Sequence, residues 1–358
     1  LVLSGFVLGA AISRSGLAAR LADPLQRHMG GSWLRLVAGV VAASYALAFV
    51  MPSNMGRIAL LMPIVLSIAD RLGLVTGTRG RAGLALAVGV GTYQLSGSIL
   101  PANVPNLVLS GAVEASYNLR LPYLPYLLLN APVLGVLKGV LVTVCVVRLF
   151  PATLPPPQAL PASVPWSRKE KRLLILLGLI LVAWMSDGVH GIAPAWVGLL
   201  AACICLLPRI GLLDGPAFSE SVNLRVCLYV GGILGLSALV AHSGLGSAIG
   251  HWMMRLLPLS ADSPLSNLGY FVALSSVLSL AVTANGVPAV FTPLAQELAS
   301  GTDLPLITVL MSQVVGYSTP WLPYQASPIV VAMAMGGVRL RDGVVLCMTI
   351  AIATAVLA

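Results

Sequence analysis

Long apolar segments alternate with short polar clusters along this chain, and two of the clusters lie at corresponding places in its two halves. The first is Met51-Pro52-Ser53-Asn54-Met55-Gly56-Arg57, and the second is Thr283-Ala284-Asn285-Gly286-Val287-Pro288. Because helix-forming apolar residues flank each cluster, the pattern predicts two helical hairpins that turn at these clusters. A further apolar segment, interrupted by proline and glycine, follows each hairpin.

The apolar segments predict an all-helical chain whose elements recur in the same order. In the first half these elements are a helix end at Leu1–Ser13, an amphipathic helix at Gly16–Met29, hairpin helices at Leu36–Met51 and Gly56–Ala69, one span interrupted at Ser96–Pro105 between Gly83–Leu95 and Asn106–Ala115, and a span at Leu124–Arg148. After a proline-rich linker at Pro151–Trp166 come spans at Leu173–Ser186, Pro194–Leu207 and Leu224–Ala241, an amphipathic helix at Gly244–Leu257, hairpin helices at Leu268–Val282 and Ala289–Ala299, one span interrupted at Tyr317–Pro328 between Leu306–Gly316 and Ile329–Met335, and a last span at Gly343–Leu357.

This recurrence divides the chain into a first repeat at 1–150, a cytoplasmic linker at 151–172, scaffold helices at 173–223 and a second repeat at 224–358. If each hairpin enters and leaves on one side of the membrane, an odd number of crossings separates the two repeats. The second repeat is therefore expected to be inverted. Inverted repeats with broken helices at matching positions are typical of secondary transporters.

The composition places these helices in a membrane. Hydrophobic residues make up 58% of the 358 residues, charged residues 9%, and the mean hydropathy is +0.96. Soluble domains have about a quarter charged residues. The first residue is a leucine within an apolar helix, so we expect the sequence to begin partway through a longer protein. The five cysteines all lie in apolar segments and fit neither a zinc site nor a disulfide framework.

Arginine and lysine predict the orientation, because cytoplasmic loops are enriched in both. The predicted loops on one side contain nearly all of the basic residues, whereas the other side has only Arg120 and Arg255. The first hairpin is therefore expected to open to the cytoplasm and the C-terminus to lie outside, in the inner (plasma) membrane. The net charge of +9 reflects this topology rather than nucleic-acid binding, because the basic residues are spread over loops.

Broken helices inside a membrane predict a binding site. Irregular backbone survives in hydrocarbon only where protein or a water-filled cavity surrounds it. The free N–H groups at one helix end attract anions, and the free carbonyl groups at the other end attract cations. One such site can hold an anionic substrate together with a cation.

Asn54 and Asn285, at the two hairpin tips, are the sharpest candidates for this site. An asparagine amide offers a carbonyl group to a cation and an NH2 group to a carboxylate. The structural alternative is that each asparagine caps the following helix. Ser53 and Thr283 have the same two interpretations, and all four are candidate substrate-binding residues.

Two basic residues lie within apolar sequence. Arg57 falls one turn into the first hairpin's second helix, where an ionisable side chain usually faces a partner or a cavity. We expect it to contact an anionic substrate, with snorkelling to the cytoplasmic interface as the alternative. Lys138, within a predicted span, is expected to snorkel rather than to shuttle protons.

The interrupted spans supply the expected cation ligands. Proline prevents a continuous helix through either break. Exposed carbonyls near Gly97 and Ser318 are therefore predicted to bind a cation, with Ser98 and Thr319 beside them and together with Asn54 and Asn285.

Several other classes of protein fit poorly. An intramembrane hydrolase needs a nucleophile with a placed base or a metal motif, and no His-Glu-x-x-His sequence occurs. A channel does not need two inverted broken-helix sites. The sequence contains no Gly-x4-Gly-Lys-Ser/Thr loop for ATP. We therefore expect neither an enzyme nor a resident cofactor other than a coupling ion.

At its hairpin tips the chain resembles the divalent anion/sodium symporter family (sodium:sulfate/dicarboxylate symporters) of the ion-transporter superfamily. That family has a Ser-Asn-Thr triplet at both tips, where this chain has Ser53-Asn54-Met55 and Ala284-Asn285-Gly286. Pro105-Asn106 resembles the Pro-Asn ending of the family's first interrupted helix. The resemblance covers essentially the whole chain, from the family's fourth spanning helix onward.

This resemblance implies a homodimeric symporter that moves a dicarboxylate or sulfate with sodium by an elevator motion. It implies that Ser53, Asn54 and Asn285 contact the substrate and sodium. Met55, Ala284 and Gly286 depart from the family pattern, and Arg57 adds a charge, so a changed anion selectivity or another coupling ion is expected. The alternative function is a proton-coupled efflux permease of the arsenite-permease-like group.

Overall fold

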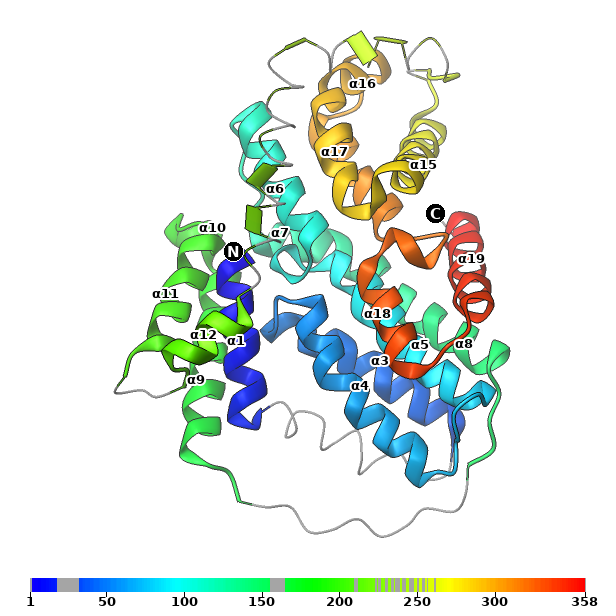
Figure 1. Cartoon of the computed structure of the whole chain (residues 1–358). Helices are drawn as coiled ribbons and strands as arrows, with labels where there is room; N and C mark the ends of the chain where they lie inside the picture. The colour runs from blue at the N-terminus through cyan, green and yellow to red at the C-terminus, as the bar shows by residue number, and fades with distance from the viewer. Residues whose placement is uncertain are drawn as a thin grey trace.

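The computed structural model describes residues 2–17, 32–154, 165–208, 212–222 and 262–357, together with shorter stretches between 223 and 261. The regular structure of these residues is helical throughout (Figure 1), so the predicted all-α class is confirmed. The predicted amphipathic helices Gly16–Met29 and Gly244–Leu257, the span Leu224–Ala241 and most of the linker Pro151–Trp166 lie largely outside the described residues.

The helices agree in order with the sequence pattern. The first half contains α1 (Val2–Ser15), α3 (Trp33–Val50), α4 (Asn54–Arg71), α5 (Arg79–Leu95), α6 (Val104–Tyr117), α7 (Tyr123–Asn130), the π-helix η3 (Ala131–Leu137) and α8 (Lys138–Leu149). The second half contains α9 (Arg168–Met185), α10 (Asp187–His190), α11 (Pro194–Leu206), α12 (Gly215–Ser221), α15 (Pro264–Phe291), α16 (Ala295–Thr302), α17 (Leu306–Tyr317), α18 (Ser327–Gly336) and α19 (Leu340–Leu357).

Within the described residues, three helical stretches have the length and composition to cross a membrane, although the third of them is divided by a kink at Thr283. They are Trp33–Val50, Tyr123–Leu149 and Pro264–Thr302. Shorter apolar helices occur at Leu3–Ile12, Pro194–Leu206, Leu306–Tyr317 and Ser327–Gly336. The last two flank the second break, as expected for one span divided into two half-helices.

Helix α5 lies at the centre of the bundle and contacts α3, α4, α8 and α18 (Figure 1). Its residues from Gly83 to Leu95 are all buried. A Cβ on Gly89 would lie 2.6 Å from the Cβ of Ala332, and a Cβ on Gly336 would lie 2.3 Å from that of Ala85. These glycines let α5 and α18 approach closely, which is the usual way that helices pack inside membranes.

Both breaks end earlier than the sequence predicts. Helix α6 begins at Val104 and α18 begins at Ser327, so Pro105 and Pro328 lie in the first turns of helices rather than in the breaks. Proline is favourable there because the first N–H groups of a helix have no intrahelical partner. The prolines within the breaks, Pro101, Pro320 and Pro323, are the ones that interrupt the spans.

The two hairpin tips differ in construction. At the first tip, Ser53 is the N-cap of α4, and its Oγ accepts a hydrogen bond of 3.1 Å from the Gly56 N–H. The cap is therefore Ser53 and not Asn54, which is the first residue of the helix. At the second tip the predicted break at Thr283–Pro288 is wrong in extent, because only Thr283 leaves the helical region, with φ 59° and ψ 167°. One strongly non-helical residue is enough to redirect the chain.

The span around Lys138 is helical from Tyr123 to Leu149, but its centre is a π-helix at Ala131–Leu137. A π-helix inserts extra backbone into a turn and often occurs at functional sites. Pro132, in the first turn of this segment, cannot supply an α-helical N–H. Lys138 is the first residue after this π-helix.

Thr283 adopts a backbone conformation that is close to a glycine-only region and costs a β-branched residue free energy. Replacing it with glycine is therefore expected to increase the free energy of unfolding by about 1 kcal/mol. The measurement is the melting temperature of the purified protein in detergent. Thr283→Ala is the control, because alanine retains the Cβ atom. Equal melting temperatures for Thr283→Gly and Thr283→Ala would contradict the backbone explanation.

Candidate functional site

The two breaks of the interrupted spans touch each other at the centre of the molecule. A Cβ on Gly97 would lie 2.2 Å from Oγ of Ser318, so the two backbones approach closely at this point. The Tyr93 hydroxyl donates a hydrogen bond of 2.9 Å to the carbonyl of Tyr317. Residues more than two hundred positions apart therefore form one polar centre.

Asn106 holds the first break in its irregular conformation. Its Nδ2 lies within hydrogen-bond distance of the carbonyls of Ser96, Gly97 and Ile99, at 3.3, 3.1 and 2.9 Å. Its Oδ1 accepts a hydrogen bond of 2.9 Å from the Tyr317 hydroxyl. One buried amide thus partners carbonyls that the broken helix leaves free and also connects the first break to the second.

The first hairpin tip packs against the first break. Oγ of Ser96 lies 3.2 Å from Oδ1 of Asn54 and 2.8 Å from the carbonyl of Tyr93. Asn54 is 8% exposed, whereas Ser53 is half-buried. No acceptor in the described part of the chain takes a hydrogen bond from Nδ2 of Asn54, which leaves that NH2 group available to a ligand.

Arg57 lies completely inside this first half of the site, with an exposure of 0%. Its guanidinium donates to the carbonyl of Met51 and to Oδ1 of Asn54. It also lies 3.0 Å from the carbonyl of Ala102 and 3.3 Å from that of Thr92. The snorkelling alternative is excluded, because the charged group points into the protein.

The partners of Arg57 come from helix ends that have partial negative charge. Met51 is the C-cap of α3, and Thr92 lies in the last turn of α5. Free carbonyls at the C-terminal end of a helix stabilise a cation. Across the residues that the structure describes, no carboxylate lies within ion-pair distance of Arg57, so only the partial negative charges of backbone carbonyls and of the Asn54 amide oppose its positive charge.

The second hairpin tip lies beside the second break. Nε2 of Gln325 donates to Oγ of Ser279, one turn before the kink at Thr283. The Tyr324 hydroxyl donates a hydrogen bond of 2.7 Å to the carbonyl of Leu280. Thr283 and Asn285 are both half-buried, so their side chains are accessible at this tip.

Lys138 reaches the second break from α8. It is 2% exposed, and its Nζ donates 3.0 Å to the carbonyl of Ser318 and also donates to Oγ1 of Thr319. The expectation that Lys138 snorkels is therefore wrong. At the break, carbonyl and hydroxyl oxygens take the place of water around the ammonium group.

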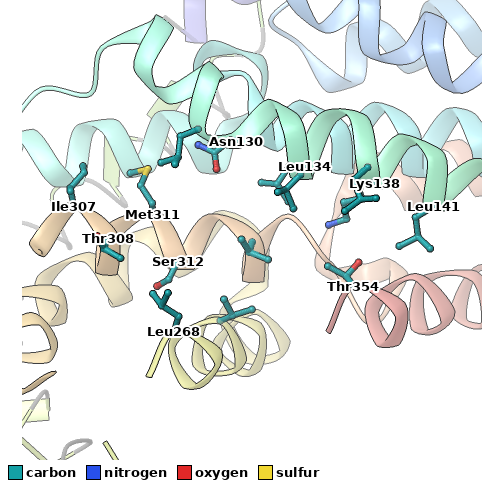
Figure 2. Close-up of a pocket in the computed structure, with 15 residues that line it drawn as sticks. Asn130, Leu134, Lys138, Leu141, Leu268, Ile307, Thr308, Met311, Ser312 and Thr354 are labelled. Atoms are coloured by element: carbon teal, nitrogen blue, oxygen red, sulfur yellow. The ribbon is translucent and has the colours of Figure 1, made fainter. Parts of the chain in front are cut away.

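A cavity of about 540 Å³ adjoins Lys138. Figure 2 shows it between the α7–η3–α8 span, which includes Asn130, and α17, which includes Ser312. Leu268 of α15 and Thr354 of α19 also line it. Most of the lining is apolar, and Lys138 is its ionisable member.

Five of the six residues predicted to bind a cation divide into two groups, and the sixth, Asn285, is half-buried at the second tip. Asn54, Ser318 and Thr319 each accept a hydrogen bond from a basic side chain, Arg57 or Lys138. Gly97 and Ser98 are occupied otherwise. The carbonyl of Gly97 accepts 2.8 Å from the Tyr126 hydroxyl, and Oγ of Ser98 lies 3.1 Å from the Tyr45 hydroxyl and 2.8 Å from the Leu95 carbonyl.

The contacts of Asn106, Tyr126, Tyr317 and Lys138 were not predicted from the sequence. Asn106 follows a proline within an interrupted span, and this position was the available signal. The two tyrosines give no sequence signal that distinguishes them from ordinary packing residues. Lys138 is a charged residue within a span, which marks a functional site more often than a snorkelling group.

Comparisons with known proteins agree with a transporter architecture. A family model described as citrate transporter matches residues 1–336. A membrane protein of Cupriavidus necator is 27% identical over 290 residues, which are 78% of this chain and 56% of that relative. The chain thus spans little more than half the length of this relative. The L-tartrate/succinate antiporter of Escherichia coli K12 is 25% identical over 92% of this chain and 70% of its own length.

The fold is similar to that of a solved structure. The crystal structure of the Alcanivorax borkumensis YdaH transporter, described as having an unusual topology, matches with a TM-score of 0.64 and 17% identity. The match covers 99% of this chain and 83% of that chain. This similarity supports the predicted transporter fold, whereas the sodium symporter family named from the hairpin tips stays a prediction.

Arg57 is expected to stabilise the folded protein as well as the site. Arg57→Met would leave the carbonyls of Met51 and Ala102 without a buried partner and lower the free energy of unfolding by about 3 kcal/mol. Arg57→Lys would recover only part of the lost free energy of unfolding, because an ammonium group cannot reproduce the planar set of N–H donors of a guanidinium.

The measurement is thermal unfolding of the purified variants in detergent. Arg35→Met is the control, because Arg35 is exposed on α3 and such changes usually stay within about 0.5 kcal/mol. If Arg57→Met unfolds at the temperature of Arg35→Met, the hydrogen bonds of Arg57 do not support the fold.

Proposed function

This chain belongs to the citrate transporter family, and we propose that it is a secondary transporter of a small anion with two or more carboxylate groups. The observation that supports this most directly is Arg57, a buried guanidinium without a carboxylate partner in the described structure. It stands behind Asn54 at the first hairpin tip. A fixed positive charge in a membrane protein marks a site for a negatively charged ligand.

In this proposal Arg57 acts through Asn54. Because Oδ1 of Asn54 accepts from the guanidinium, the amide NH2 is oriented away from it. That NH2 group, the start of α4 and the polar groups of Ser53, Thr283 and Asn285 would bind the carboxylates of the substrate. In this arrangement the anion would contact neutral hydrogen-bond donors, and the positive charge of Arg57 would lie behind them. Such a site suits a substrate that must bind and then be released.

The substrate class draws on the relatives as well as on the geometry. The family model is described as citrate transporter, and several relatives, among them that of Escherichia coli K12, are described as L-tartrate/succinate antiporters. Both descriptions concern small carboxylates. We therefore propose a dicarboxylate or tricarboxylate substrate and treat sulfate, the other anion expected from the sequence resemblance, as a competitor to be tested.

The proposed transport mode is the exchange of one anion for another. Sodium was expected at Asn54 and the breaks, but Arg57 and Lys138 already supply positive charge to Asn54, Ser318 and Thr319. Moving an empty site with fixed positive charge through hydrocarbon is costly. Return without a bound anion would therefore be slow, which favours exchange over symport with sodium or a proton.

The remaining architecture is proposed from the sequence pattern. Residues 1–150 and 224–358 would form two inverted repeats, and a domain containing both hairpins would move as an elevator through the bilayer in a homodimer. The clustering of basic residues on one set of loops supports a cytoplasmic first hairpin and an external C-terminus.

The site assignment predicts that both tip asparagines are needed for transport. In proteoliposomes loaded with succinate, citrate or tartrate, Asn54→Ala and Asn285→Ala should each lower exchange of a labelled dicarboxylate by about tenfold or more. Gln296→Ala, an exposed amide on α16, is the control. Near-normal exchange by both tip variants would exclude these asparagines from the site.

The transport mode predicts that sodium is dispensable. Exchange in vesicles loaded with unlabelled anion should proceed at the same rate in sodium, potassium or choline buffer, and uptake into empty vesicles should be slow, because an unloaded site does not return. An absolute requirement for a sodium gradient would support symport instead. Proton-driven efflux of arsenite without carboxylate exchange would support the permease alternative.

A further inference from the structure

Lys138 belongs neither to a hairpin nor to a break. It is the first residue of α8 in the first half of the chain, whereas both oxygens that it contacts belong to the second break, 180 and 181 positions later. The contact joins two elements that are remote in sequence. The groups that Lys138 partners are therefore the oxygen atoms of the second break.

The second break presents oxygen atoms at a helix end. Ser318 is the C-cap of α17, so its carbonyl lies at the negative end of that helix. The hydroxyl of Thr319 donates 2.7 Å to the carbonyl of Val315, which leaves its lone pairs for the Lys138 ammonium. Oγ of Ser318 is buried and has no partner in the described residues. Such oxygens at an unwound helix are the usual ligands of a monovalent cation in a transporter.

The first break has an equivalent arrangement with a different residue. There Arg57 of the first hairpin contacts carbonyls at the ends of α3 and α5 and also the carbonyl of Ala102 within the break. Each break therefore receives one basic side chain. Neither side chain has a carboxylate within ion-pair distance among the residues described, so both positive charges remain to be balanced by a ligand.

A cavity lies beside the Lys138 side chain (Figure 2). The cavity has a volume of about 540 Å³. A neighbouring cavity of about 450 Å³ includes Thr319, the other end of the contact. Removing the lysine side chain would thus open its position to a small solute.

We propose that the Lys138 ammonium is a built-in cation that occupies a monovalent-cation site formed by Ser318 and Thr319 at the second break. The site is complete without a soluble ion as long as Lys138 is present. Without the lysine, it would bind sodium or a small amine. The consequence for transport depends on the proposed exchange function, but the binding geometry does not.

The test compares two substitutions at Lys138. Lys138→Ala removes the charge and the stem and leaves the oxygens facing an empty space, whereas Lys138→Met removes the charge but fills the space. The melting temperature of each purified variant is measured in sodium, methylammonium or choline chloride at equal ionic strength. Arg120→Met is the control for loss of a positive charge, because Arg120 and its partner Glu114 are both exposed.

The expected result is specific to Lys138→Ala. Its melting temperature should fall below that of the wild type and rise again in sodium or methylammonium but not in choline, while the wild type, Lys138→Met and Arg120→Met respond to no cation. Exchange by Lys138→Ala should be lowered about tenfold or more and recover with the same cations. Exchange by Lys138→Met should stay low.

Two outcomes would overturn the proposal: a Lys138→Ala melting temperature that no small cation raises, or a Lys138→Met variant with wild-type exchange. The melting measurement needs no substrate. If the wild type exchanges no carboxylate but Lys138→Ala still responds to sodium or methylammonium, the proposed function fails and the cation site stands.

Discussion

Backbone carbonyl groups that lose their helical partners inside a membrane are the constraint on which this structure depends. Hydrocarbon offers such groups no hydrogen bond, so each must find a donor within the protein. The two interrupted spans and two hairpin tips create many such groups at the centre of the chain. The donors are an amide on Asn106, hydroxyls on Tyr93 and Tyr126, and the charged groups of Arg57 and Lys138.

The use of charged donors has an electrostatic consequence. A neutral amide such as Asn106 partners carbonyls without changing the charge of the site. A guanidinium or ammonium group partners carbonyls and also leaves a net positive charge, since helix dipoles provide only partial compensation. A small anion at the hairpin tips would complete the balance, which joins the fold of the breaks to the proposed selectivity and to exchange as the transport mode.

The breaks are supported by close packing as well as by hydrogen bonds. Gly89 and Gly336 bring α5 and α18 together, and Gly97 lets the first break touch Ser318 of the second. The π-helix in the span before Lys138 provides the local change of direction that a regular helix would not. The site is therefore positioned by elements that are themselves irregular. A substitution in any of these elements is expected to displace the charged groups of Arg57 and Lys138.

The sequence by itself determined the helices, the membrane location and the positions of both breaks, because apolar length, proline and glycine act locally. It also marked Ser53, Asn54, Thr283 and Asn285 as tip residues and Arg57 as an unusual charge. The boundaries of the helices were predicted less accurately: Pro105 and Pro328 were assigned to breaks although first helical turns accept proline, and the second tip proved to be one residue, Thr283.

Only the tertiary structure decided which groups the buried side chains contact. Arg57 donates hydrogen bonds to oxygens of the first hairpin tip, of α5 and of the first break. Lys138 contacts Ser318 in the second break, 180 positions away in the sequence. No local pattern encodes such contacts, since they arise when distant helices pack and leave a buried donor facing a buried acceptor.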